Sequence, residues 1–297
     1  MSLFSITIHF SFGGAKLETA ILGSHPPLVI LALGVLGLVI GSFLNVCIFR
    51  IPEGTFWQKA RSICRSCGTL IPSYRNIPVF SFFLQRGRCA SCHERISWQY
   101  PVVEALSAIL FVAFYWKYPF LIGHDGHMEM DWGNFLRYSH GAIFCCFLII
   151  ATFVDLRLMI IPDVISLGLV VLSPLVVFLH PELRWQDSLF GVLLGGGLLY
   201  GIAWLYWMLK KQIGMGMGDV KFLAGIGGWL GWQSIGPVVL YAAISGSVIG
   251  LLVMAVRGRN MKMALPFGPY LALAALLFLW FGPEMLQWLQ FGGSGQV

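Results

Sequence analysis

Residues 27–49 read PLVILALGVLGLVIGSFLNVCIF, an apolar stretch without Asp, Glu, Lys or Arg. A helix needs roughly 20 such residues to cross the hydrocarbon layer of a bilayer, so this stretch predicts a membrane-spanning helix. The whole composition agrees, because 58% of the residues are hydrophobic and 11% are charged, whereas a soluble domain carries about 25% charged residues. The chain is therefore predicted to be an all-α polytopic membrane protein.

Seven further stretches that are poor in charge follow the first one. The run from Phe222 to Val256 has no charge and is too long for one span. We expect a tight hairpin at residues 232–237 to divide it, since glycine and proline there punctuate helices. The sequence predicts about eight transmembrane helices, near residues 27–49, 101–122, 138–155, 163–180, 188–209, 220–234, 236–256 and 266–289.

Basic residues predict the orientation, because Lys and Arg accumulate in the cytoplasmic loops of membrane proteins. The loop after the first span holds eight of them against Glu53 and Glu94, so we expect it to be cytoplasmic. Counting spans forward places further basic residues on the same side, namely Arg157, Lys210, Lys211, Lys221, Arg257, Arg259 and Lys262. Topology and anionic lipid then explain the formal charge of +6 better than nucleic acid does, and no nucleic-acid partner is expected.

Four cysteines in that loop form two CxxC pairs. Cys64 and Cys67 make the first, Cys89 and Cys92 make the second, and 21 residues separate them. This spacing suits a closed tetrahedral zinc site close to the zinc-ribbon pattern. A reducing cytoplasm argues against structural disulfides. Because four thiolates leave no open coordination position, we expect a structural zinc ion in a small domain inserted after the first helix.

Two other metal or thiol interpretations are weaker. His93 and Glu94 begin an HExxH-like pattern, but Ser97 stands where the second histidine is required, so the metalloprotease motif is absent. Cys47, Cys145 and Cys146 lie within apolar spans and are expected to be packing residues.

Asp155 and Asp219 stand at the edges of apolar segments. An acidic group is costly to place there, so it indicates a functional site, and two of them suggest paired carboxylates. The span count puts both at the cytoplasmic ends of their helices. Gly216 and Gly218 beside Asp219 would allow close approach of a substrate backbone, although a flexible turn before a helix is the alternative.

Two more charged residues flank these aspartates. Asp163 follows Pro162 and precedes an apolar helix, so we favour a helix-capping role over catalysis. Lys221 could stabilise a nearby carboxylate, contact a lipid phosphate or serve only as a topology determinant. These alternatives stay open.

The order of several motifs resembles the type IV prepilin peptidases, which are bifunctional leader peptidases and N-methyltransferases and belong to the GxGD membrane aspartic proteases. The motifs, besides the CxxC pairs, are GSFLNVCIFRIP (41–52), NIPVFS (76–81), RGRC (86–89), YPVVE (100–104), DLRLMIIPD (155–163), GMGDVK (216–221) and PFGP (266–269). The resemblance implies four parts, which are an N-terminal tail (1–26), a first span (27–49), a cytoplasmic zinc-binding domain (50–100) and a membrane peptidase core (101–297).

The resemblance also implies an activity. Asp155 and Asp219 would be the catalytic pair, with Gly216, Gly218 and Lys221 close to the substrate. The substrates would be prepilins or pseudopilins, whose short basic leader is removed at the cytoplasmic face of the bacterial inner membrane. The pilus or type II secretion machinery would be the wider partner.

The resemblance further implies that the new N-terminus is methylated with S-adenosylmethionine. The pocket for this cofactor is not legible in the sequence, because no GxGxxG stands in a strand-turn-helix setting. Polar residues near the cytoplasmic boundary could line it, namely Asn45, Arg50, Glu53 and Glu104. Each could equally satisfy backbone groups or anchor a helix.

Two other classes of protein compete with the peptidase. An ion-coupled transporter would use intramembrane acids to carry ions and would keep the zinc module as an appendage, but it would need acids near the midplane of the bilayer. A zinc-anchored scaffold for a secretion apparatus would need no catalysis, so replacing Asp155 by Asn would leave its function intact.

Overall fold

The computed structural model describes residues 26–57, 62–124, 127–180, 182–212, 215–257 and 266–291, with side chains to residue 286 except at positions 123, 124, 127 and 257. The chain divides into two compact units, Met1–Cys146 and Phe147–Val297, and the division falls inside one helix. Almost all of the predicted N-terminal tail lies outside the described residues, as do residues 59, 61, 259 and 262 of the predicted basic loops.

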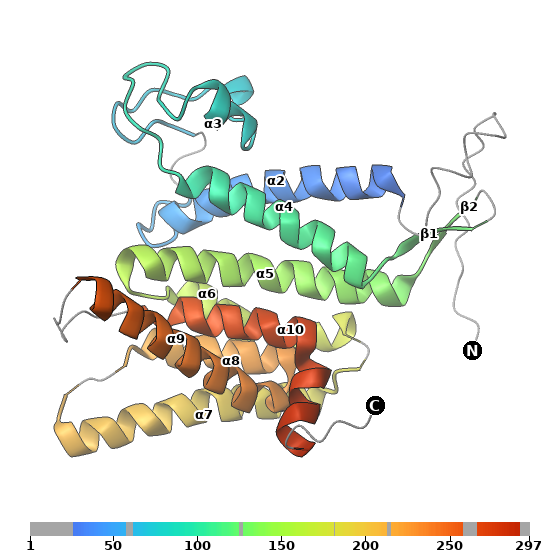
Figure 1. The fold of residues 1–297 in the computed structure, drawn as a ribbon, viewed down its shortest axis with the longest axis vertical. Coiled ribbons are helices and arrows are strands. Elements are labelled where there is room, and N and C mark those ends of the chain that lie inside the picture. The colour runs from blue at the N-terminus through green and yellow to red at the C-terminus, as the bar shows by residue number, and fades with distance from the viewer. Residues whose placement is uncertain are drawn as a thin grey trace. The chain divides into compact units, whose positions relative to one another are not determined.

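Unit 1 is built on two antiparallel apolar helices, α2 (Pro27–Arg50) and α4 (Gln99–Lys117), which lie side by side (Figure 1). Glycine makes the approach possible. A Cβ on Gly37 would lie 2.6 Å from the Ala108 Cα, and one on Gly41 would lie 2.6 Å from the Glu104 Cα. The two backbones therefore touch directly, which is a common way for membrane helices to associate.

The segment between α2 and α4 forms a small module with little regular structure. It contains η1 (Ser73–Arg75), the short helix α3 (Phe80–Leu84) and two isolated antiparallel bridges, Ile63 with Leu70 and Arg88 with Arg95. After α4, strands β1 (Leu121–His124) and β2 (His127–Met130) pair antiparallel, with Leu121 opposite Met130. Helix α5 (Trp132–Leu158) follows. Its residues up to Cys146 belong to unit 1, and the rest belong to unit 2.

The described part of unit 2 holds the end of α5 and five further helices. These are α6 (Asp163–Leu179), α7 (Trp185–Lys210), α8 (Met217–Leu230), α9 (Ile235–Arg257) and α10 (Gly268–Phe291), with the turn η2 (Trp232–Ser234) before α9. The predicted hairpin is confirmed, since Gly231 ends α8 with a φ of +83°, a conformation that glycine adopts without strain. Helix α10 is bent at Phe281, two residues before Pro283.

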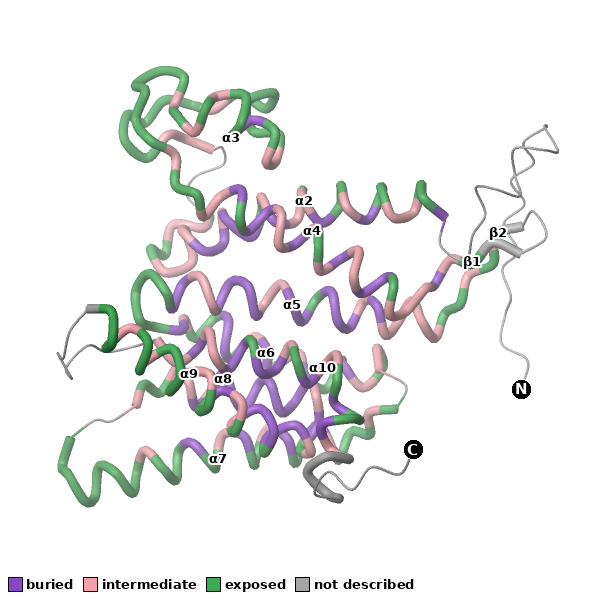
Figure 2. Tube along the Cα trace, in the orientation of Figure 1, coloured by how far each residue is buried: buried purple, intermediate pink, exposed green. Residues whose placement is uncertain are grey.

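Helix α8 is the core of unit 2. It packs against α6 and α7, and nearly every residue from Val220 to Trp229 is buried (Figure 2). A Cβ on Gly225 would lie 2.6 Å from the Leu169 Cβ of α6, and one on Gly195 of α7 would lie 2.5 Å from the Leu223 carbonyl oxygen. Trp229 Nε1 donates a hydrogen bond of 2.9 Å to the Leu169 carbonyl oxygen. The outer faces of α7 and α9 carry exposed apolar side chains instead, as expected for contact with lipid.

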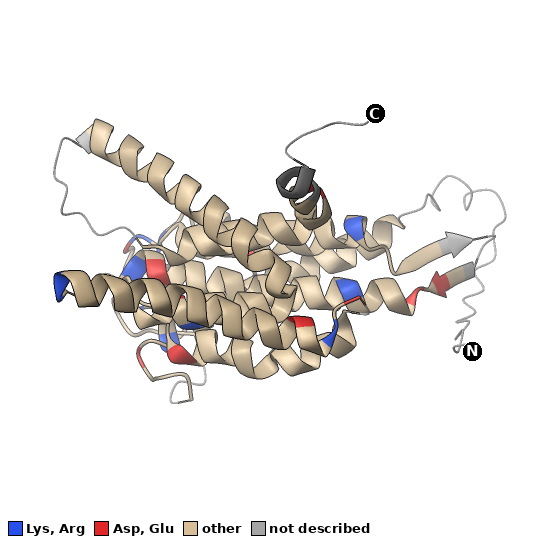
Figure 3. Ribbon diagram, turned by 90° about the horizontal axis from the view of Figure 1, so that it is seen from below, with Lys and Arg blue, Asp and Glu red and all other residues tan. Residues whose placement is uncertain are grey.

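The described residues form eight apolar helices at or near the predicted positions, and six of them are long and apolar enough to cross a membrane, namely α2, α4, α5, α7, α9 and α10. Charged side chains lie mainly toward helix ends and leave long uncharged stretches (Figure 3). Helix α8 has 14 residues and is about 21 Å long at 1.5 Å per residue, less than the ~30 Å hydrocarbon layer. That all eight helices span a membrane stays a prediction.

Candidate active site

Asp155 lies near the end of α5 and is only 4% exposed. Its carboxylate is held from a distant part of the chain, because the backbone N–H of Gly268 donates a hydrogen bond of 2.9 Å to Asp155 Oδ2. Gly268 is the first residue of α10. The first N–H groups of a helix have no partner within the helix and carry its positive dipole end, so they suit a carboxylate.

Only glycine fits at position 268 without moving this carboxylate. A Cβ there would lie 2.8 Å from Asp155 Oδ2 and 3.0 Å from Ile161 Cδ1. Sequence reasoning did not single out Gly268 as a site residue. The signal was present in the PFGP motif, where glycine follows Pro266 and Phe267 at the start of an apolar segment.

Asp219 lies in the first turn of α8, after the N-cap residue Gly216. The turn rests on the connection between α5 and α6, because a Cβ on Gly218 would lie 3.1 Å from the Ile161 carbonyl oxygen and 3.2 Å from the Ile161 Cβ. Gly218 therefore serves backbone packing. Gly216 is more open, and the nearest atom to a Cβ there is Asp219 Oδ2 at 3.7 Å.

The structure brings Asp155 and Asp219 to the same end of unit 2. Both flank Ile161, which touches Gly268 beside Asp155 and Gly218 beside Asp219. The backbone turns that carry the two carboxylates therefore share Ile161 as a neighbour. Like charges at short range favour a shared proton over two full negative charges.

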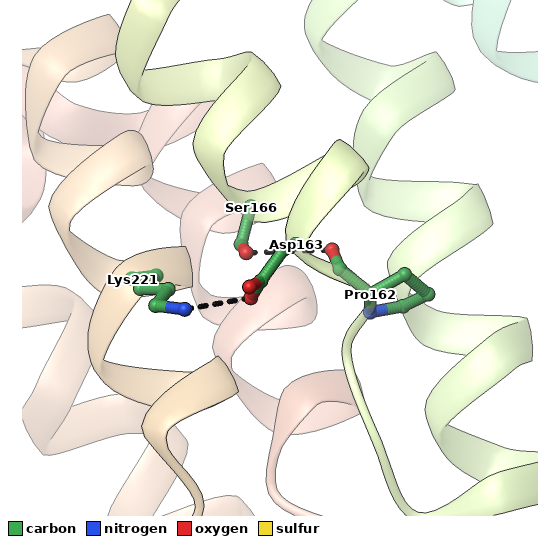
Figure 4. Close-up of polar contacts among 4 residues, drawn as sticks. All are labelled: Pro162, Asp163, Ser166 and Lys221. Carbon is green, nitrogen blue, oxygen red and sulfur yellow. Dashed lines mark hydrogen bonds and ion pairs between the residues drawn. The ribbon is translucent and has the colours of Figure 1, made fainter. Parts of the chain in front are cut away.

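Lys221 and Asp163 form an ion pair next to this site, with 2.7 Å between Lys221 Nζ and Asp163 Oδ1 (Figure 4). The pair joins the N-terminal end of α8 to the N-terminal end of α6. Prediction of a capping role for Asp163 was wrong, since Pro162 is the N-cap residue of α6 and no side chain caps that end. The carboxylate is drawn to the ammonium group of Lys221 instead of to the backbone N–H groups of its own helix.

The four cysteines of the two CxxC pairs come together in unit 1, with all four Sγ atoms within 4.8 Å of one another. Each pair sits in the same kind of turn. The N–H of Gly68 donates to the Cys64 carbonyl oxygen and the N–H of His93 donates to the Cys89 carbonyl oxygen, both at 2.9 Å. Gly68 and His93 both have positive φ, +71° and +60°. The cluster is therefore two copies of one turn, which together could hold a metal ion.

The sulfur positions suit a tetrahedral metal ion. Cys64 Sγ and Cys92 Sγ are 3.9 Å apart, and zinc–sulfur bonds of about 2.3 Å in a tetrahedron place two sulfurs about 3.8 Å apart. All four thiols are free of disulfides. Cys67 Sγ lies 3.2 Å from Thr69 Oγ1.

The cofactor candidates Asn45, Arg50, Glu53 and Glu104 all line one cavity of about 550 Å³ in unit 1. Asn45 and Glu104 are buried, at 1% and 6% exposure. Of the three remaining cysteines, Cys47 and Cys145 are buried and Cys146 is half-buried, consistent with packing roles.

This geometry defines a polytopic membrane protein with two carboxylates at one end of a helical unit and a four-cysteine module. The chain belongs to the type IV leader peptidase family. The sequence model of that family matches residues 142–251, and the model of the Bacterial Peptidase A24 N-terminal domain matches residues 35–118. No solved structure matches significantly.

Three relatives illustrate the likeness, and each is named "Prepilin leader peptidase/N-methyltransferase". The protein from Xanthomonas campestris is 33% identical over 92% of this chain and 99% of its own length. The one from Pseudomonas aeruginosa is 30% identical over 92% of this chain and 97% of its own length. The one from Pectobacterium carotovorum is 34% identical over 82% of this chain and 90% of its own length.

Proposed function

We propose that this chain is a membrane aspartic endopeptidase that removes the leader from prepilins or pseudopilins and then N-methylates the new N-terminus. The reaction follows from the names of its relatives and from its family. The observation that supports the peptidase half is the buried Asp155 carboxylate, which accepts a hydrogen bond from the Gly268 N–H and lies, like the turn that carries Asp219, beside Ile161. The comparisons give no support to an ion-coupled transporter.

The paired carboxylates carry out peptide hydrolysis by sharing one proton. The ionised carboxyl takes a proton from a water molecule, whose oxygen attacks the scissile carbonyl carbon, while the protonated carboxyl donates to the carbonyl oxygen. Collapse of the tetrahedral species breaks the C–N bond, and the leaving amine receives a proton. The two roles belong to the pair of Asp155 and Asp219 as a unit.

Gly216, Gly218 and Lys221 lie close to the substrate in this proposal. Gly216 is the open position of the three, because no atom of another helix crowds a Cβ there. Gly218 and Lys221 act indirectly, since they fix the first turn of α8 to Ile161 and Asp163. They are positioning residues for Asp219.

The active site faces the cytoplasm of a bacterial inner membrane in this proposal. The described residues at the Asp155 end of unit 2 include Arg157, Lys210, Lys211 and Arg257 as well as Lys221, and such basic residues mark the cytoplasmic side. In the eight-span topology, the short buried helix α8 counts as one crossing. The pilus or type II secretion machinery is the proposed wider partner. The proposed parts of the chain itself are a tail, a first span, a zinc-binding domain and a peptidase core, which are divided at residues 26, 49 and 100.

A structural zinc ion would occupy Cys64, Cys67, Cys89 and Cys92. Four thiolates close the coordination shell, so the ion would stabilise the module without binding substrate. S-Adenosylmethionine is the proposed methyl donor, because the relatives are N-methyltransferases.

A cleavage assay tests the whole proposal. Purified protein in detergent is mixed with a full-length prepilin, and the products are read by intact mass. The expected product has lost its leader and, with S-adenosylmethionine present, has gained about 14 Da, the mass of one CH₂ group. Failure to cleave any of several prepilins would refute the peptidase proposal.

A further inference from the structure

The cavity in unit 1 lies where the cysteine module meets the ends of α2 and α4. Its volume of about 550 Å³ falls within the range of about 300–1,000 Å³ that is usual for small-molecule sites. Ser42 and Asn45 come from α2, Ser81 from α3, and Tyr100 and Glu104 from α4. Three elements far apart in the sequence thus build one site.

Two buried polar atoms on the residues that line this cavity have no hydrogen-bond partner among the described residues. They are Asn45 Oδ1 and Ser81 Oγ, on side chains whose residues are 1% and 6% exposed. Asn45 Nδ2 donates a hydrogen bond of 3.1 Å to the Tyr100 carbonyl oxygen, which fixes the amide group. An unsatisfied buried polar atom is costly and rare, so these two atoms indicate a missing polar ligand.

The buried Glu104 carboxylate has no cationic partner in the described part of the chain. Its Oε2 accepts a hydrogen bond of 2.7 Å from the Val79 N–H, and the Ser42 side chain also hydrogen-bonds to it. No Lys, Arg or His of the described residues forms an ion pair with it. Buried charges are normally paired, so Glu104 is suited to a cationic group of a ligand.

The Val79 backbone is strained to make this contact. Its φ is +59°, in the left-handed region that a β-branched residue avoids. Strain of this kind tends to be kept at functional sites. The Val79 N–H therefore holds Glu104 in place at a conformational cost.

The rest of the cavity wall is aromatic and basic. The Phe49 and Tyr100 rings stack with centroids 5.2 Å apart, and the Arg65 guanidinium lies 4.3 Å from the Phe49 ring centroid. Arg65 also pairs with Glu53. A ligand that carries a cation, a carboxylate and a heteroaromatic ring would match such a lining.

We infer that this cavity binds the sulfonium methyl donor, of the S-adenosylmethionine class, with Glu104 as the counter-charge of its sulfonium and with Asn45 and Ser81 as hydrogen-bonding residues. The inference rests on the proposed N-methyltransferase function and assigns that function to unit 1. The bound donor supplies an electrophilic methyl group. Glu104 stabilises the positive charge of the donor, while Asn45 and Ser81 fix its position.

Binding measurements on the purified full-length protein test the assignment. Equilibrium dissociation constants are measured for S-adenosylmethionine and for S-adenosylhomocysteine, which lacks the sulfonium charge. Glu104→Gln keeps an acceptor for the Val79 N–H and is expected to weaken S-adenosylmethionine binding at least about tenfold, but S-adenosylhomocysteine binding less than about threefold. Ser81→Ala is expected to weaken both by about threefold to tenfold.

Matched controls come from unit 1 outside the cavity. Glu129→Gln in β2 and Ser73→Ala in η1 remove the same groups from residues that do not line the cavity, and both are expected to bind like wild type. Zinc content measured by mass spectrometry shows that each variant retains the folded module.

The outcomes separate the two proposals. If Glu104→Gln and Ser81→Ala both bind the donor with wild-type affinity, the inference about the cavity is overturned, even where wild type methylates a cleaved prepilin. If wild type neither binds the donor nor methylates, the N-methyltransferase proposal fails together with the site.

Discussion

Replacing Gly268 by alanine tests how the Asp155 carboxylate is held. The new Cβ would lie 2.8 Å from Asp155 Oδ2, about 0.6 Å closer than an ordinary contact of about 3.4 Å between carbon and oxygen. The carboxylate is the mobile end of a side chain, so it can rotate away while the fold survives. That movement lengthens the 2.9 Å hydrogen bond from the Gly268 N–H beyond the usual limit of about 3.2 Å.

The expected loss of activity follows from this hydrogen bond. A hydrogen bond to a charged group is worth about 1.5–3 kcal/mol, and about 1.4 kcal/mol corresponds to a factor of ten in rate. Gly268→Ala is therefore expected to lower the rate of leader cleavage by about tenfold to 150-fold in a single-turnover assay read by intact mass.

Gly197→Ala is the matched control, because nothing lies within 4 Å of a Cβ at that position of α7. It is expected to cleave at the wild-type rate. A folded Gly268→Ala protein with a rate within twofold of wild type would show that the Gly268 contact does not hold the catalytic carboxylate.

Three further substitutions or treatments have distinct expected effects. A Cβ on Gly191 would overlap the Gly227 carbonyl oxygen, so Gly191→Ala is expected to lower the free energy of unfolding by about 1–3 kcal/mol and to lower the Tm measured in detergent. An unchanged Tm would contradict the close packing of α7 on α8. Lys221→Met breaks an ion pair that is partly exposed, with 30% and 62% of the two side chains accessible, and such pairs contribute at most about 1 kcal/mol to stability. It is therefore expected to lower kcat for leader cleavage while leaving Tm nearly unchanged. A lower kcat accompanied by a clearly lower Tm would indicate a purely structural role. Removal of zinc with a chelator is expected to abolish binding of S-adenosylmethionine, because Cys64 and Cys89 line the cavity; retention of binding after verified loss of zinc would contradict this link.

Sequence reasoning reached the helices and the acids because their signals are local. Uncharged stretches and a turn with glycine and proline predict helices and a hairpin at the residues where the structure has them. The rarity of acids at the edges of apolar segments is enough to single out Asp155 and Asp219. Family resemblance then supplied their catalytic role.

Such local signals could not predict contacts between residues that are distant along the chain. Gly268 is 113 residues from Asp155 along the chain, and nothing in either local sequence reports the hydrogen bond. The Asp163 carboxylate forms an ion pair with Lys221 instead of capping its own helix, as its local sequence had predicted. The sequence predicts a short helix at 220–234, but hydropathy could not show that this helix, α8, is buried among its neighbours.

The cofactor cavity illustrates the same limit. Asn45 and Glu104 were candidates because they are polar residues near a predicted boundary, whereas Ser81 appeared only as the last residue of the NIPVFS motif and was not singled out. That these residues share one cavity, and that two of the buried atoms there lack partners, depends on how α2, α3 and α4 come together.

The most direct test of the paired-carboxylate account is leader cleavage by Asp155→Asn and Asp219→Asn, measured beside Asp187→Asn. Asp187 is at the start of α7, where it accepts a hydrogen bond from Trp232 Nε1, so it is an acid of unit 2 away from the site. The account predicts that each active-site variant stays folded and loses at least about a hundredfold in cleavage rate, while Asp187→Asn cleaves like wild type. Cleavage near the wild-type rate by either folded active-site variant would contradict it.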